Sequence, residues 1–195
     1  SPPLSTSQLV AGGGQARIRL VAPWNAKKPT SFRVKAGQLA APKVGIDGKR
    51  YPLEHIRHLV RNGDMPKGGE AMAQQVFDLV NSARRKAGLA ALRKNTALAG
   101  AARSQACDNA ATQKASHTGA GGSSLSQRLK RAGYRFRVAA ENVGLGFNSD
   151  PGQAMDWWLK SPEHRANILH PKLTDMAVFV AQGPKHSWTV VFGGR

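Results

Sequence analysis

The sequence predicts an α+β domain with helices layered on an antiparallel sheet, preceded by a small, basic, β-rich extension. Residues 1–70 contain short stretches that alternate apolar and basic residues, the pattern of half-buried strands. From residue 71 the apolar residues recur at helical spacing, and from residue 176 they form two β-branched and aromatic runs. Helices followed by late strands are typical of a layered α+β domain.

The extension contains two predicted strands, at residues 17–21 and 31–35. Their alternation gathers four cations on one face of a small sheet, a candidate anion-binding surface made of Arg17, Arg19, Arg33 and Lys35. A hairpin is predicted over residues 44–51, a helical segment over 53–60 and a linker over 65–69. We therefore divide the chain into a basic extension or docking segment, 1–70, and a main domain, 71–195.

The main domain has helical spacing within residues 72–88, 95–115 and 123–133, and again from residue 150. Residues that favour a helix start precede three of these segments: Asn95 or Thr96, then Ser123 or Ser124, then Asp150 before a proline. A further helix is expected to open at Ser161. Strands are predicted at 138–145, 176–180 and 188–192.

Charge is the unusual feature of the composition, because 29 Lys and Arg against 11 Asp and Glu give a net charge of +18. The excess lies on both sides of residue 70, so it is not confined to a basic tail. Such a surface favours anionic partners, here an anionic envelope polymer or lipid headgroups. Nucleic acid is the less favoured partner, because aromatic residues make up only 6% of the chain and few lie among the cations.

The single cysteine, Cys107, excludes an intramolecular disulfide, and its alanine-rich surroundings favour a packing role. No run reaches the roughly 18 apolar residues that a membrane-spanning helix needs. The chain starts with Ser-Pro-Pro, without Met, as expected if a leader has been removed.

Three short polar motifs mark the candidate site, SHTG at 116–119, AEN at 140–142 and SPEHRANIL at 161–169. Together with N-x-x-R-x-x-x-G-L-x-x-L at 81–92, Trp158 before the third motif and a terminal Trp-containing strand, they occur in a characteristic order and spacing. In this the sequence resembles the bacterial branch of the CAP superfamily, named for cysteine-rich secretory proteins, antigen 5 and plant pathogenesis-related proteins. The resemblance covers roughly residues 71–194 and none of residues 1–70.

The resemblance implies a three-layer α-β-α sandwich with a central antiparallel sheet, and a secreted, periplasmic or cell-surface location. It also implies a cleft lined by two His and two Glu, of which three match His117, Glu141 and His164. Ser161 stands where the second Glu is expected, and Glu163 follows two residues later. We assign Glu163 to the first turn of a helix, where a carboxylate complements the helix dipole. The expected cleft is therefore His117, Glu141, Ser161 and His164.

In better-studied members the two His can bind a divalent metal, which makes His117 and His164 candidate metal ligands and zinc the candidate cofactor. Neutral imidazole suits Zn²⁺, and a nearby carboxylate can fix the tautomer of the ring. Glu141 and His164 are the candidate catalytic residues, although Glu141 could instead only accept backbone hydrogen bonds. The neighbouring serines are assigned to turns and caps, since the chain has no Gly-x-Ser-x-Gly motif.

The sequence leaves three candidate functions open. A binding or structural role at the cell envelope is favoured. The alternatives are a metal-assisted hydrolase acting on an envelope polymer or peptide, with Glu141 as general base, and a subunit that docks into a larger envelope assembly through residues 1–70.

Overall fold

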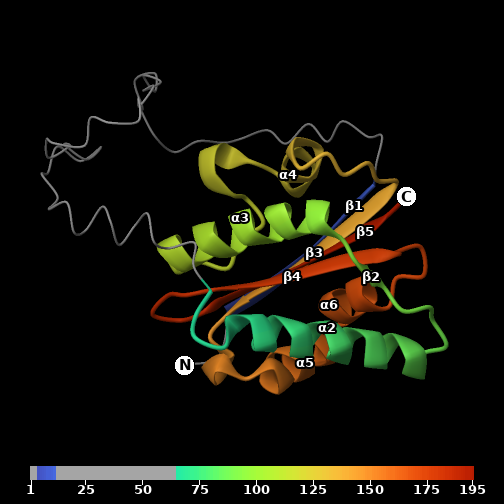
Figure 1. The fold of residues 1–195 in the computed structure, drawn as a ribbon, viewed down its shortest axis with the longest axis horizontal. Coiled ribbons are helices and arrows are strands. Elements are labelled where there is room, and N and C mark those ends of the chain that lie inside the picture. Colours follow the sequence, from blue (N-terminus) through green and yellow to red (C-terminus); the bar gives the residue numbers. More distant parts are fainter. Residues whose placement is uncertain (1–3, 12–64) are drawn as a thin grey trace, which may run out of the picture. The chain divides into compact units, whose positions relative to one another are not determined.

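The computed structural model describes residues 4–11 and 65–195, which belong to one compact unit (Figure 1). Its strands are β1 (Leu4–Ala11), β2 (Arg93–Lys94), β3 (Val138–Leu145), β4 (Asp175–Ala181) and β5 (Ser187–Gly194). Its helices are α2 (Gly69–Lys86), α3 (Thr96–Thr112), α4 (Leu125–Arg131), α5 (Pro151–Lys160) and α6 (Pro162–Ile168). The predicted strands at 17–21 and 31–35, the hairpin, the helical segment and the cation set Arg17, Arg19, Arg33 and Lys35 lie outside the described residues.

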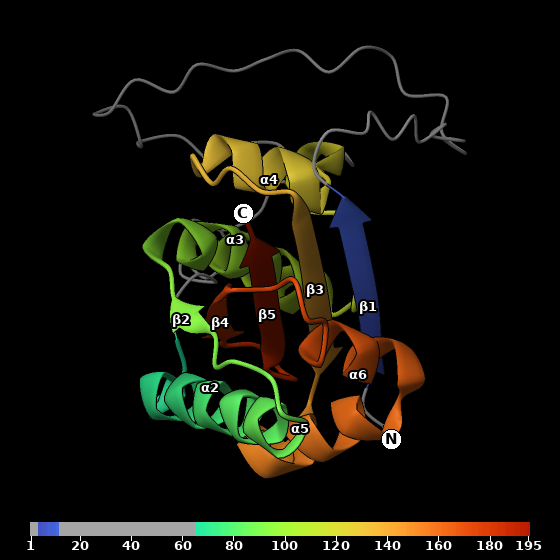
Figure 2. The same ribbon diagram turned by 90° about the vertical axis from the view of Figure 1, so that its right-hand side faces the viewer.

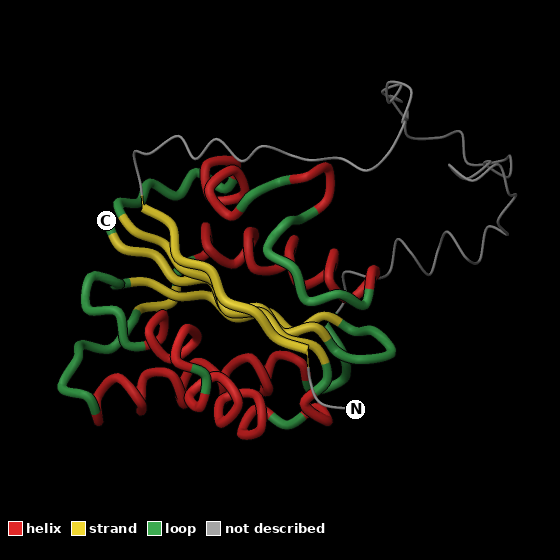
Figure 3. Tube along the Cα trace, turned by 180° about the vertical axis from the view of Figure 1, so that it is seen from behind, coloured by secondary structure: helices red, strands yellow, loops and turns green. Residues whose placement is uncertain are grey.

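The five strands form one sheet in the order β1-β3-β5-β4-β2, covered by helices on both faces. Helices α2, α5 and α6 cover one face and α3 and α4 cover the other (Figure 2). Seen along the sheet, the strands form a single layer between two layers of helix (Figure 3). The predicted three-layer α-β-α sandwich is confirmed, with one difference: the two-residue strand β2 pairs parallel to β4, while the other pairs are antiparallel.

The predicted helix starts are explained by local hydrogen bonds. The Asn95 side chain accepts from the Ala97 amide at 3.0 Å, ahead of α3. Ser124 opens α4 with a capping box that it shares with Gln127. Asp150 accepts from the amides of the first turn of α5, which starts with a proline. Because such caps depend only on residues a few positions apart, the sequence located these helices well.

Two apolar cores lie on opposite faces of the sheet. Alternation along β5 sends Val190 into the core beneath α2 and α5, and Val191 into the core beneath α3 and α4. Trp158 is fully buried in the first core, whereas its neighbour Trp157 is 41% exposed. One of the two adjacent tryptophans therefore packs inward and the other faces solvent.

Tyr134, which follows α4, closes the end of the second core. Its hydroxyl donates to Asp175 Oδ2 at 2.7 Å, and burial together with this bond raises the pKa of Tyr134 to about 12. Gly193 on β5 lies against the ring, where an added Cβ would be only 2.4 Å from Tyr134 Cε1. Only glycine fits at this position without a shift of the ring or the strand.

Strand β1 was not predicted from the sequence. It pairs antiparallel with the whole of β3, from Leu4↔Leu145 to Ala11↔Val138, and so forms the edge of the sheet. Its residues lie in the segment assigned to the extension, so the division at residue 70 left out one strand of the main sheet. The pattern alone could not reveal this, because the partner strand lies more than 120 residues away in sequence.

Candidate functional site

Strand β3 carries the centre of the candidate site. Side chains alternate between the two faces of a strand, so consecutive residues contact different helix layers. Glu141 contacts Arg128 of α4, and Asn142 contacts α6 on the opposite face. Both residues lie fully buried beside β1, opposite Gln8 and Ser7.

His117 is paired with Glu141 in the structure. The His117 Nδ1 lies 2.8 Å from Glu141 Oε1. Since a carboxylate only accepts, Nδ1 carries the proton in this pair. The imidazole side chain is 16% exposed, while Glu141 is fully buried.

Arg128 completes this arrangement and was missed by the sequence analysis. One guanidinium nitrogen donates to Glu141 Oε2 at 2.6 Å, and another donates to the backbone oxygens of Ser123 at 2.9 Å and His117 at 3.1 Å. Arg128 therefore neutralises the buried carboxylate and also fixes the backbone that carries the imidazole. A buried charge is tolerated when it is paired and hydrogen-bonded in this way.

The loop before His117 is anchored from α3. The side-chain amides of Gln105 and Asn109 both donate to the Ser116 backbone oxygen, at 2.7 and 3.0 Å. They lie one helical turn apart, and Gln105 also donates to Asn109 at 2.9 Å. These buried amides fix the backbone before His117 from α3, and Arg128 fixes the backbone of His117 from α4.

His164 lies in a separate hydrogen-bonded chain at the start of α6. Its Nδ1 lies 2.7 Å from Ser161 Oγ, and that hydroxyl donates to Glu163 Oε2 at 3.1 Å. A hydroxyl has one proton, so when it is donated to Glu163 the Ser161 oxygen accepts from a protonated His164 Nδ1. Ser161 thus links the imidazole to a carboxylate two residues away.

Glu163 has the local role that the sequence predicted. It is exposed in the first turn of α6. Its own backbone amide and the Ser161 hydroxyl lower the pKa of Glu163 below the ordinary value. The Ser161 hydroxyl connects it to His164, whose charge also lowers the pKa of Glu163.

Asn142 and Asn167 hold α6 against the sheet. Asn142 donates to the His164 backbone oxygen at 3.1 Å, and Asn167 donates to Asn142 Oδ1 at 2.9 Å. All three residues are buried, so these bonds are shielded from water. Asn167 is therefore a structural hydrogen-bonding residue.

The structure brings the predicted site residues together as two pairs. His117 and Glu141 lie on the α4 side of β3, and His164 and Ser161 lie at the α6 side, next to Asn142. We call His117, Glu141, Ser161, His164 and Arg128 the histidine site. Within residues 65–195, no group of three or more His, Cys, Asp or Glu side chains is placed to hold a metal ion. Both oxygens of Glu141 already have partners. His117 and His164 belong to no such group among the described residues, and zinc binding stays a prediction.

The first motif of the domain, residues 81–92, serves the fold and supports the site from behind. Asn81 exchanges two hydrogen bonds with the backbone of Leu92. Arg84 is 1% exposed and donates to the backbone oxygens of four residues, Ala90, Ile168, His170 and Leu173. It therefore fixes the end of the helix that carries His164.

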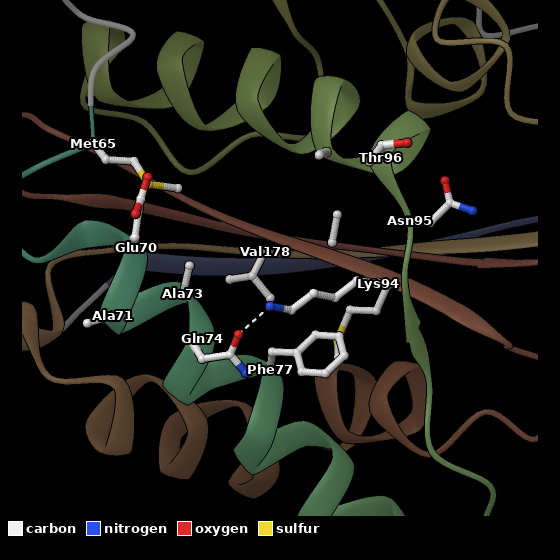
Figure 4. Close-up of a pocket in the computed structure, with 13 residues that line it drawn as sticks. Met65, Glu70, Ala71, Ala73, Gln74, Phe77, Lys94, Asn95, Thr96 and Val178 are labelled. Atoms are coloured by element: carbon white, nitrogen blue, oxygen red, sulfur yellow. Dashed lines mark hydrogen bonds between the residues drawn. The ribbon is translucent and has the colours of Figure 1, made fainter.

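A pocket lies at the opposite edge of the sheet, between α2 and the start of α3 (Figure 4). Its volume is about 590 Å³, and Phe77, Met176 and Val178 contribute apolar surface. Lys94 reaches over it to the side chain of Gln74 and lies 5.3 Å from the Phe77 ring centre. None of the predicted site residues lines this pocket.

Comparison with known proteins agrees with this geometry. The sequence profile of the cysteine-rich secretory protein family, CAP, matches residues 77–192, which include every residue of the histidine site. The chain belongs to the CAP family. The predicted family membership is confirmed, and the described fold is the framework on which this CAP domain carries its histidines.

Two relatives of the CAP domain come from Bacillus subtilis strain 168. The uncharacterized protein YkwD is 30% identical over 131 residues, 67% of this chain and 50% of its own length. The uncharacterized membrane protein YlbC is 32% identical over 107 residues, 55% of this chain and 31% of its own length. The matched part of the chain thus spans half of the first relative and about a third of the second.

Solved structures with this fold include bacterial surface proteins. An extracellular protein of Bacillus anthracis that contains an SCP domain is 29% identical with a TM-score of 0.60, covering 67% of this chain and 43% of that one. An outer surface protein of Borrelia burgdorferi has a TM-score of 0.59 at 19% identity, covering 64% and 93%, and shares the fold. In the part of the chain that the structure describes, no helix is long and apolar enough to cross a bilayer.

Proposed function

We propose that this CAP-domain protein is exported and binds an anionic ligand at the cell envelope, with the histidine site as its specific contact. The arrangement of His117, Glu141 and Arg128 carries this proposal. A partly exposed imidazole is held by a fully buried carboxylate, which is in turn neutralised by a buried guanidinium. Such an imidazole is held in a fixed orientation, as a preorganised binding residue requires.

The described surface offers a second contact for an anionic polymer. Residues 109–140 contain six Lys and Arg and no Asp or Glu. Four of these cations are exposed on or just after α4, and we call them the α4 cluster: Lys130, Arg131, Arg135 and Arg137. They belong to the same segment as Arg128, so the cluster and the histidine site are linked through α4. The anion-binding prediction for the extension stays a prediction, because its four cations lie outside the described residues.

The α4 cluster can be tested with poly(glycerol phosphate), a soluble anionic polymer. We expect replacement of all four cations by Ser to weaken binding at least tenfold, and binding of the unaltered chain to fall steeply between 50 and 300 mM NaCl. The matched control replaces four other exposed cations by Ser, Lys86, Lys160, Lys172 and Lys185, with the same change in net charge. Equal losses in the two variants would show that net charge alone attracts the polymer and would contradict the role of the cluster.

The enzyme alternative has less support from the geometry. A metal-assisted hydrolase would use His117 and His164 as zinc ligands and Glu141 as general base. Both Glu141 oxygens are held by other groups, so a role as base requires one of those bonds to break. Zinc titration of the chain and of His117→Ala tests the metal. Turnover of peptide and cell-wall substrates that is lost in Glu141→Gln would favour the hydrolase over the binding role.

The assembly alternative concerns residues 1–70, and its test must keep β1. Removal of the whole segment would also remove β1, a strand of the CAP sheet. Replacing residues 12–64 by a short Gly-Ser linker keeps this strand. If those residues specify docking, we expect the linker variant to fold and to lose incorporation into the envelope fraction. Retained incorporation would contradict a docking role for them.

A further inference from the structure

Strand β1 is a separate piece of chain laid along the edge of the CAP sheet. It pairs with all eight residues of β3, yet residues 12–64 intervene before the next described element. Without β1, the order of strands would leave β3 at the edge, with half of its backbone amides and carbonyls unpaired. An exposed edge of this length is a template for the addition of another extended segment.

The position of β1 coincides with the histidine site. Gln8 lies opposite Glu141 and Ser7 lies opposite Asn142, the two β3 residues that contact His117 and the backbone of His164. Helix α6, which carries His164, also contacts β1. The segment that completes the sheet therefore passes beside both histidine pairs.

The composition of residues 4–11 indicates which class of partner the edge of β3 can bind. Residues 4–11, LSTSQLVA, contain no charged residue in a chain of net charge +18. Strand β3 has one charged residue, Glu141, and Arg128 neutralises it. The pairing therefore relies on main-chain hydrogen bonds and not on charge, so it suits an uncharged, extended peptide.

We propose that the edge of β3 is a binding site for an uncharged extended peptide, occupied in this chain by its own residues Leu4–Ala11. A tethered strand competes with a free peptide through its effective concentration, which falls as the tether lengthens. More than 50 residues separate β1 from α2 in sequence, and in this proposal a segment of another protein takes the place of β1 by the same main-chain pairing. The inference rests on the proposed function only in treating the histidine site as a binding site.

The test opens the site without shortening the chain. In a strand, successive amides point to opposite sides, so a double substitution Ser7→Pro with Gln8→Pro removes one donor that faces β3 whichever register applies. The control, Ser7→Ala with Gln8→Ala, retains both amides. The probe is a fluorescein-labelled peptide with the sequence of residues 1–13, followed by fluorescence anisotropy.

We expect the proline variant to bind the probe saturably, and the unaltered chain and the alanine control to bind it at least tenfold more weakly. Binding should change less than twofold between 50 and 300 mM NaCl. Equal binding to all three chains, or no binding to a folded proline variant, would overturn the proposal. A concentration-dependent dimer of the unaltered chain with the probe excluded would assign the site to a second copy and would also overturn it.

If the proline variant does not fold, hydrogen exchange of the unaltered chain tests whether β1 can be displaced. We expect the β3 amides that face β1 to exchange through an opening that leaves the β5 amides protected, since β1 can leave while the rest of the sheet remains. Exchange of β3 and β5 at the same rate would show that β1 leaves only on global unfolding, which overturns displacement. No anionic polymer is present in either assay, so failure here is distinct from failure of the α4 cluster.

Discussion

The buried pair of Arg128 and Glu141 gives the sharpest test of how the histidine site is held. Arg128→Met removes three hydrogen bonds and leaves a fully buried carboxylate without its cation. Breaking a buried ion pair from one side costs about 3–5 kcal/mol. With a urea m-value of about 2 kcal/mol/M, the unfolding midpoint should fall by about 2 M. Tryptophan fluorescence can follow unfolding, because Trp158 and Trp188 are buried in the core.

A double-mutant cycle separates the pair from its other contacts. Glu141→Gln should cost less than Arg128→Met, because the guanidinium keeps two backbone acceptors. The double variant should be more stable than the sum of the single losses predicts, with a coupling of at least about 1.5 kcal/mol. Arg131→Met on the same helix is the control and should change stability by less than about 0.5 kcal/mol, since Arg131 is exposed. Single losses that add within about 0.5 kcal/mol would refute the pairing.

Three further predictions concern positions around the sheet and the site. The pKa of Tyr134 is raised in the folded state, so the protonated hydroxyl stabilises the fold below about pH 10, and this stabilisation is lost as the pH rises toward 12. The shift contributes at most about 2.7 kcal/mol to the free energy of unfolding. Urea unfolding at pH 9 and pH 12 should show a steeper loss for the unaltered chain than for Tyr134→Phe, and parallel curves would contradict it. Gly193→Ala should lower the free energy of unfolding by about 1–3 kcal/mol, because the added methyl group clashes with the Tyr134 ring. Gly100→Ala, on an exposed helix face with no atom within 4 Å, should raise it by up to about 1 kcal/mol. Thermal unfolding of the two variants distinguishes these outcomes. Ser161→Ala should raise the pKa of Glu163 toward its ordinary value in an NMR titration, and an unchanged pKa would show that the hydroxyl does not donate to it.

Local chemistry explains which elements the sequence predicted well. Asn95, Ser124 and Asp150 each cap a helix through atoms two or three residues away, so the signal lies within the segment itself. The two long strands after residue 174, β4 and β5, were likewise marked by their own β-branched and aromatic composition. These elements determine the two helix layers and most of the sheet between them.

Non-local contacts explain what the sequence analysis missed. Nothing within residues 4–11 identifies β3 as their partner, because strand pairing depends on a register set across the whole fold. Arg128 stands in a basic helix beside Lys130 and Arg131, where composition predicts a solvated face. Its burial becomes apparent only when Glu141, thirteen residues later, turns toward the same helix. Arg128 is part of the site because it lies next to a distant strand, and its residue type alone does not reveal this.

The pairing of β1 with β3 also affects the order in which the chain can fold. The ribosome makes β1 first, but its partner follows about 130 residues later, and β5, which supports that partner, comes later still. Contacts between distant segments form slowly because a long loop must close before they stabilise anything. The sheet edge should therefore be the last part to assemble, after β3, β4 and β5 have paired. Until then the nascent chain presents an unpaired strand, which a chaperone can shield.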